Sequence, residues 1–239
     1  MEINLVTPDN PFTQMQKHQY ENETDAMMAS GGPGGHRHHD ANPDYWGVLL
    51  KDLTVGDWSD KLVLDFGCGG GRNVWNVLHN VSVKEAHGCD ISSSNIKYCE
   101  NYLKSSVYSN FKFFTVNGVS VSNLESNSYD FIFSTITLQH ISVYSIRNSI
   151  LQDLHRILKP GGILSFQMAF GSGHPNPTPY YDDRWNLELT NGAYDVQILN
   201  EDVLLQHLTS IGFNSVTAQV RPSWADINHQ TWIYARGIK

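Results

Sequence analysis

The stretch that most constrains the fold of this chain runs from Val63 to Asn73, where an apolar run ends in an acid and then in glycines. Its residues are Val-Leu-Asp-Phe-Gly-Cys-Gly-Gly-Gly-Arg-Asn. An apolar run that breaks directly into glycines and continues as a helical pattern predicts a strand, a tight turn and the start of a helix. Ligands of α/β proteins bind at such turns, because glycine lets the backbone turn sharply and lets a ligand lie across it.

The spacing of the glycines disfavours one class of nucleotide-binding protein. In the dinucleotide fingerprint G-x-G-x-x-G, the third glycine lets the helix pack closely on the strand. Counting from Gly67, that place is held by Arg72. A NAD-dependent dehydrogenase is therefore the least favoured interpretation.

Composition sets the outer limits of the interpretation. A chain of 239 residues is long enough for one α/β domain with appendages. A net charge of -8 and the lack of a basic run argue against a nucleic-acid partner. Three cysteines do not make a disulfide framework. Residues 1–11 lack the apolar core of a signal peptide. No apolar stretch is long enough to span a membrane. We therefore expect a soluble cytoplasmic protein with no membrane partner.

The hydrophobic pattern after residue 60 alternates between strands and helices, which predicts an α/β fold. Apolar and β-branched runs predict strands over residues 61–66, 85–90, 111–116, 129–134, 163–169, 214–220 and 231–236. Helical spacing predicts helices over 72–78, around Ile96 to Leu103, over 144–158, and from a cap at Asn200 to a stop at Gly212. The last two strands are expected to form an antiparallel hairpin.

The segments outside this alternation are predicted to cover the sheet. Residues 1–60 are polar and broken by Pro and Gly, so we interpret them as a cap segment with short helices near 12–28 and 45–53, and residues 61–239 as the main domain. The long loop at about 170–200 is rich in aromatic residues and is predicted to be a lid. The tract from His36 to Asp40 is open to three interpretations: a metal cluster, a substrate-binding loop or a solvated hinge. A single glycine-flanked tract disfavours metal, so no metal site is predicted.

Asp90 ends the predicted second strand, about twenty residues after the glycines. An acid at this position can accept hydrogen bonds from both hydroxyls of a ribose. The alternative is a helix cap, but Ser92, Ser93 and Ser94 already offer caps for the helix that follows. The residue therefore indicates a nucleoside site without selecting the class of nucleoside ligand.

Three motifs together resemble one family. Asp65, Gly67, Gly69 and Gly71 fit an acidic-x-G-x-G-x-G pattern that is similar to motif I of the Rossmann-like (class I) S-adenosylmethionine-dependent methyltransferases. Residues 135–141, with a Gln-His pair, resemble the segment after strand four of the small-molecule methyltransferases, and they lack the Asn-Pro-Pro-Tyr of enzymes that grip a flipped base. The Leu-Lys-Pro-Gly-Gly at 158–162 is also a hallmark of the family. The resemblance covers about residues 61–212.

The resemblance implies a Rossmann-like three-layer sandwich with a seven-stranded, mostly parallel sheet and an antiparallel last strand. It also implies transfer of a methyl group from S-adenosyl-L-methionine to an oxygen or nitrogen of a small molecule, with S-adenosyl-L-homocysteine as the product. Asn117 stands where the family commonly has an aspartate that accepts from the adenine amine, and an ordinary Asn-Gly turn is the alternative. The residues it implies for the cofactor are Asp65, Gly67, Cys68, Gly69, Arg72, Asp90, Ile91, Asn117, Gly118, Val119 and Ser134.

The acceptor side of the site is inferred from location. His140 is the first choice of general base when the acceptor must lose a proton, although a capping or packing histidine is equally compatible with the sequence. The residues expected near the acceptor are Gln139, His140, His36, His38, Tyr180, Tyr181 and Trp185. Two other functions stay open: a protein methyltransferase, and a cofactor-binding protein that transfers no methyl group.

Overall fold

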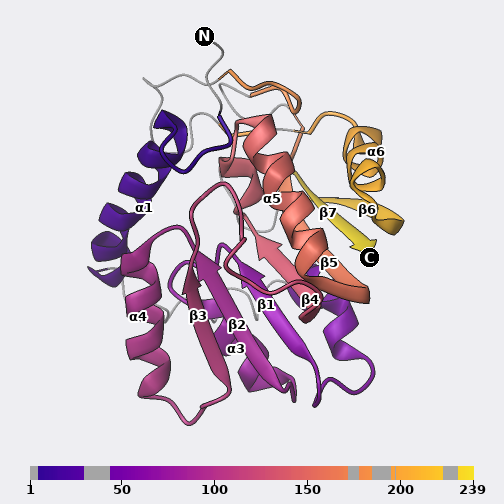
Figure 1. Ribbon diagram of the computed structural model, residues 1–239. Helices are drawn as coiled ribbons and strands as arrows, with labels where there is room; N and C mark the ends of the chain where they lie inside the picture. Colours follow the sequence, from indigo (N-terminus) through magenta and orange to yellow (C-terminus); the bar gives the residue numbers. More distant parts are fainter. Residues whose placement is uncertain (1–4, 30–43, 172–177, 185–194, 197, 223–230) are drawn as a thin grey trace.

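The computed structural model describes residues 5–29, 44–171, 178–184, 195–196, 198–222 and 231–239 (Figure 1). Three residues expected near the acceptor, His36, His38 and Trp185, lie outside the described residues. None of the helices in the described ranges is both long and apolar enough to cross a membrane.

The described chain is organised around one seven-stranded sheet with the order β3-β2-β1-β4-β5-β7-β6. Strand β7 runs antiparallel to both of its neighbours, and the remaining pairs are parallel, so the predicted sheet is confirmed. The strands are β1 (Leu62–Phe66), β2 (Glu85–Asp90), β3 (Phe111–Thr115), β4 (Tyr129–Thr135), β5 (Leu158–Phe170), β6 (Asn214–Pro222) and β7 (Thr231–Ile238).

The helices lie close to their predicted positions. They are α1 (Pro11–Ala29), α3 (Arg72–Asn80), α4 (Ser93–Lys104), α5 (Tyr144–Ile157) and α6 (Glu201–Ile211), with a 3-10 turn η4 (Leu138–His140) after β4. The predicted helix over 45–53 is instead a π turn, η2 (Tyr45–Leu49), followed by a 3-10 turn, η3 (Lys51–Thr54). Asn200 caps α6 as expected, because its side-chain oxygen accepts from the Asp202 N–H at 3.0 Å.

Strand β5 begins five residues earlier than the pattern predicts. The Pro-Gly-Gly sequence does not end the pairing, because Gly161 takes a positive φ of 80° and the Gly161 N–H donates to the carbonyl of Lys239 at 2.9 Å. Lys239 N–H in turn donates to Gly162 O at 3.0 Å. The glycines therefore form an irregularity within the strand, where a register shift also occurs against β4.

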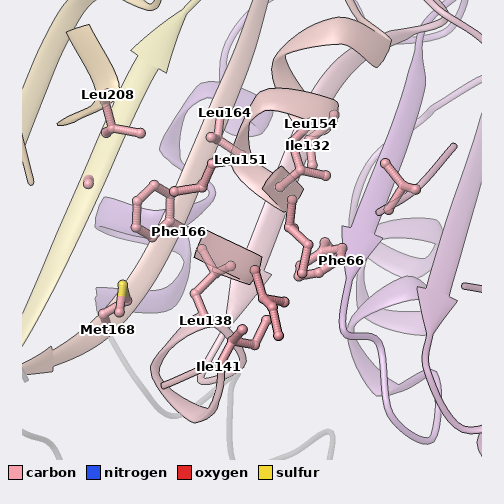
Figure 2. Packing of buried hydrophobic residues seen from close by; sticks show 14 of the residues in the cluster. Phe66, Ile132, Leu138, Ile141, Leu151, Leu154, Leu164, Phe166, Met168 and Leu208 are labelled. Carbon is pink, nitrogen blue, oxygen red and sulfur yellow. The ribbon is translucent and has the colours of Figure 1, made fainter. Parts of the chain in front are cut away.

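Helices cover both faces of the sheet and give the three layers. On one face, α5 packs on β5, and α6 packs on β6 and β7. Figure 2 shows residues of this cluster, among them Leu151 of α5, Leu164 of β5 and Leu208 of α6. On the other face, α3 and α4 bury a second apolar cluster together with η2 and η3. Burial of apolar area on both faces is the main stabilisation of such a sheet.

Residues before β1 take two different places. Residues 44–54 lie on the α3 face, where Asp52 pairs with Arg236 at 2.8 Å and the hydroxyl of Ser165 donates to Leu49 O at 2.7 Å. Helix α1 lies beside α4, and Phe12 at its start is fully buried in the α5-side cluster (Figure 1). The division of the chain at residue 60 stays a prediction.

Candidate active site

A pocket of about 210 Å³ opens at the carboxyl ends of β1, β2 and β4. Parallel strands present their carboxyl ends at one edge, and the strand order changes direction between β1 and β4, which is where α/β proteins bind ligands. Three turns that follow β1, β3 and β4 contribute to the wall, and α1 closes it from the other side. The pocket is therefore assembled from segments far apart in the sequence.

The glycine turn after β1 forms the floor of the pocket. Gly67 and Gly69 both line it, with φ angles of 74° and 49°. The N–H groups of Gly67 and Cys68 donate to the Cys89 carbonyl at 2.8 and 3.0 Å, so the turn is fixed to β2. A Cβ on Gly67 would overlap the side chain of Thr137, which shows how closely the segment after β4 approaches the turn.

Asp90 faces the pocket from the end of β2 and is almost fully buried. One carboxylate oxygen accepts from Gly69 N–H at 2.9 Å, and the other accepts from Ser92 N–H at 2.9 Å. Burial raises the pKa of this carboxyl, and these hydrogen bonds oppose the rise. Because a carboxylate has about four lone-pair sites, Asp90 can still accept hydrogen bonds from a ligand in the pocket.

The turn after β3 forms a side wall. Ile91 and Gly118 line the pocket, and a Cβ on Gly118 would lie 2.6 Å from the Thr13 methyl group of α1. The Asn117 side-chain oxygen accepts from the N–H groups of Val119 and Ser120 at 3.0 and 2.8 Å. Asn117 therefore shapes this turn from outside the pocket wall, and Val119 also lies off the wall, in the hydrophobic core.

Other residues expected at the cofactor lie behind the glycine turn. Asp65 is 1% exposed, and neither carboxylate oxygen has a hydrogen-bond partner within the described residues. Burial raises its pKa from 3.8 to about 8, although the nearby Arg72 guanidinium opposes this. Ser134 donates to Phe66 O at 2.9 Å, and Cys68 is buried in the α3-side cluster. None of these four side chains is part of the pocket wall.

His140 lines the pocket from η4. Its Nδ1 lies 2.7 Å from a carboxylate oxygen of Asp195, and Gln16 of α1 donates to its backbone carbonyl. Gln139 points away from the pocket, because its side-chain oxygen accepts from Ala169 N–H at 3.1 Å. The structure thus brings only one member of the predicted Gln-His pair to the pocket.

The two lid tyrosines lie elsewhere. The Tyr180 hydroxyl is 2.8 Å from His207 Nδ1, and its ring lies under the buried Arg147 guanidinium at 4.4 Å. Tyr181 donates to Val203 O at 3.1 Å. Neither tyrosine lines the pocket, so the structure does not bring them to the predicted acceptor site. Their contacts anchor the described part of the lid to α5 and α6.

The sequence did not predict several residues that line the pocket or that contact a residue lining it. Gln16 and Tyr20 come from α1, where no local motif distinguishes them, and Asp195 reaches His140 through tertiary packing alone. Thr137 was accessible to prediction, because it directly follows β4 at the edge where ligands bind. Its neighbour Ile136 has a φ of 56°, a conformation rare for a β-branched residue, so the backbone of this segment is strained beside the pocket.

No group of three or more metal-ligating side chains occurs among the residues with described positions. The pocket residues do fit a nucleoside cofactor. The glycine turn gives a floor without side chains, Asp90 offers a buried acceptor, and the Gly118 turn offers a flat wall. The fold and the pocket therefore define a Rossmann-like domain that binds a nucleoside-containing ligand.

Comparison with known proteins shows that part of this chain is similar to methyltransferases. Residues 64–164 match the family model described as a methyltransferase domain. Phosphoethanolamine N-methyltransferase 2 of Caenorhabditis elegans is 27% identical over 168 residues, which cover 70% of this chain and 36% of that protein. The tRNA N(3)-methylcytidine methyltransferase trm140 of Schizosaccharomyces pombe is 24% identical over 127 residues, covering 49% of this chain and 39% of that protein. The chain thus spans well under half the length of both relatives.

The solved structures agree on the fold. Phosphoethanolamine N-methyltransferase 2 of Haemonchus contortus, solved with phosphomonomethylethanolamine and S-adenosylhomocysteine, aligns with a TM-score of 0.63 at 13% identity. The alignment covers 92% of this chain and 60% of that one. Residues 64–164 thus match a methyltransferase domain, and the described chain has the Rossmann-like fold of that solved methyltransferase.

Proposed function

We propose that this protein transfers a methyl group from S-adenosylmethionine to an oxygen or nitrogen of a small molecule. The observation that carries the proposal is the pocket itself, in which Asp90, the Gly67–Gly69 turn and His140 face one space. The bound cofactor supplies a methyl carbon on a sulfonium, whose sulfur is a good leaving group. The protein then has to align the acceptor and exclude water.

The cofactor-binding roles follow the positions in the pocket. Asp90 accepts from the ribose hydroxyls, the glycine turn lies against the methionine part, and the Ile91 and Gly118 walls hold the adenine between them. His140 and Thr137 would then lie near the methionine end of the cofactor, because both line the pocket where the segment after β4 meets the turn. Asp65 and Arg72 lie behind the turn and outside the pocket wall.

His140 is the proposed general base for an acceptor that must lose a proton. With S-adenosylmethionine bound, a ring nitrogen of His140 would take the proton that the acceptor oxygen or nitrogen loses on methylation, and the cofactor would supply the methyl group and a sulfur that keeps the bonding electron pair. Nδ1 is engaged by Asp195, so Nε2 is the nitrogen that serves this role.

Two features support a small acceptor. Helix α1 covers the pocket, since Gln16 and Tyr20 lie in its wall, so the described walls form a pocket and not an open groove. The net charge of -8 opposes a polyanionic acceptor. The Caenorhabditis elegans relative is named for a small acceptor, and the Schizosaccharomyces pombe relative is named for tRNA, so both classes enter the test.

The test measures S-adenosylhomocysteine by mass spectrometry after incubation with S-adenosylmethionine and one of three acceptor pools. The pools are small amines and hydroxyl compounds, whole protein extract, and bulk tRNA. We expect product above the no-acceptor background with the small-molecule pool only. Product with only protein or tRNA would overturn the small-molecule assignment, and cofactor binding without product in any pool would indicate a binding protein.

A variant pair tests the base. With an acceptor from the small-molecule pool, His140→Gln is expected to lower turnover by ~10²-fold or more. The matched control is His155→Gln, because His155 lies on α5 against Phe213, with ring centroids 4.8 Å apart, and is not part of the pocket wall. Equal turnover of the two variants would remove His140 from the mechanism.

A further inference from the structure

We propose that Asp195 is a positioning residue that fixes His140 in the tautomer with its proton on Nδ1, which leaves Nε2 free to accept a proton. The inference rests on the proposed function for its catalytic meaning. The tautomer itself depends only on Asp195, His140 and the groups that contact them.

The side chains of Asp195 and His140 are in direct contact. Asp195 Oδ1 lies 2.7 Å from His140 Nδ1, a distance within the range of charge-assisted hydrogen bonds. The Asp195 side chain is 3% exposed and that of His140 is 25% exposed, so the acid is buried and the imidazole reaches the pocket. A carboxylate only accepts hydrogen bonds, and therefore the proton of this contact belongs to Nδ1.

Gln139 presents its amide N–H group, and not its oxygen, to the Asp195 carboxylate. The N–H of Ala169 at the end of β5 donates to Gln139 Oε1 at 3.1 Å. The amide nitrogen of Gln139 must therefore be on the other side, where it donates to Asp195 Oδ2 at 3.4 Å. Both carboxylate oxygens of Asp195 are thus approached by donors, one from Gln139 and one from His140.

Backbone hydrogen bonds hold Asp195 in place. The N–H of Val196 donates to Gln139 O at 2.8 Å, and the N–H of Thr178 donates to Asp195 O at 3.1 Å. The first bond joins the residue after Asp195 to the segment after β4, from which His140 also comes, and the second joins Asp195 to Thr178 of the lid. The carboxylate is therefore held in fixed register with the imidazole, as positioning requires.

This arrangement predicts a specific effect of Asp195→Asn. The Asn oxygen must take the Oδ2 place, since Gln139 donates there, which puts the Asn amide nitrogen opposite His140 Nδ1. Nδ1 then becomes an acceptor and the ring proton moves to Nε2. The imidazole keeps its place but presents a donor to the acceptor substrate, and it can no longer take a proton from it.

The tautomer is read directly by ¹⁵N NMR of histidine-labelled protein, with His140→Gln used to assign the signal. At a pH where the ring is neutral, the wild type is expected to show a protonated Nδ1 and a bare Nε2. Asp195→Asn should show the reverse, and Asp195→Ala a mixture. The control Asp183→Asn neutralises another lid acid, which accepts from Ser145 N–H at 2.7 Å, and should leave the His140 signals unchanged.

Kinetics give the second readout. With a methyl acceptor in hand, Asp195→Asn should lower kcat by ~10²-fold, while the acceptor KM and the affinity for S-adenosylmethionine change by less than about threefold. Identical His140 signals in wild type and Asp195→Asn would overturn the inference. If the NMR result holds but no acceptor pool gives product, the proposed function fails while the positioning geometry stands.

Discussion

The buried carboxyl of Asp65, behind the glycine turn, is predicted to make the stability of the protein depend on pH. Replacing Asp65 with Asn removes a titratable carboxyl that is buried without a hydrogen-bond partner in the described residues. Because burial raises the folded-state pKa from 3.8 to about 8, the folded state holds the proton more tightly than the unfolded state does. The wild type therefore loses stability as the pH rises from about 4 to about 8.

The size of the effect follows from the pKa shift. Between the unfolded-state pKa and pH 7, the shifted pKa of Asp65 lowers the stability of the wild type by roughly 1.4 kcal/mol per pH unit. The wild type is therefore less stable at pH 7 than near pH 4 by about 4 kcal/mol from this group alone. The Asn amide also lacks partners there, which costs about 1–3 kcal/mol. Asp65→Asn should therefore be more stable than the wild type by about 1–3 kcal/mol at pH 7, and less stable near pH 4.

The assay is urea unfolding of both proteins from pH 4.5 to pH 8.5. The control is Asp130→Asn on the neighbouring strand β4, because Asp130 accepts from Leu62 N–H at 2.9 Å and from Lys159 at 2.6 Å. That variant loses partners and should be destabilised throughout. A difference between Asp65→Asn and wild type that does not grow with pH would refute this account of the buried carboxylate.

Two further changes test the turn and the lid anchor. Gly67→Ala should destabilise the protein by about 3 kcal/mol in urea unfolding, because its φ is positive and its Cβ would overlap Thr137. Gly69→Ala, with no atom near its Cβ, should cost about 1 kcal/mol. Similar losses of stability in the two variants would contradict the overlap with Thr137. His207, whose pKa is lowered to about 4 by burial and by the Arg147 charge, should stabilise the fold above about pH 6.5 and lose this effect as the pH falls toward 4. In His207→Gln, the urea concentration at the unfolding midpoint should therefore depend less on pH between pH 6.5 and 4 than it does in the wild type. An unchanged pH dependence of the midpoint would contradict this role of His207.

The elements that the sequence predicted well are those with local causes. The apolar run into glycine predicted the turn after β1, and the acid that ends β2 predicted Asp90 at the pocket, because strand ends and turn residues are encoded within a few positions. The same local logic placed His140 at the open end of β4.

The parts that sequence reasoning missed depend on packing between distant segments. Gln16 and Tyr20 reach the pocket because α1 lies against α4, and Asp195 meets His140 across 55 residues of chain. Of the lid tyrosines expected at the acceptor, Tyr180 contacts His207 and Arg147 instead, and Tyr181 donates to Val203 O. Polar residues in irregular segments carry no periodic signal, so their partners emerge only from the fold.

The central claim, that the pocket binds S-adenosylmethionine through Asp90, is tested most directly by calorimetric titration of the wild type and Asp90→Ala. Asp130→Asn serves as the control for loss of an acid away from the pocket, and thermal melts establish that each variant is folded. The account predicts saturable binding to the wild type and to Asp130→Asn, and affinity lower by ~10²-fold for Asp90→Ala, as two hydrogen bonds to a carboxylate are lost. No binding to the wild type, or equal affinity in Asp90→Ala, would contradict it.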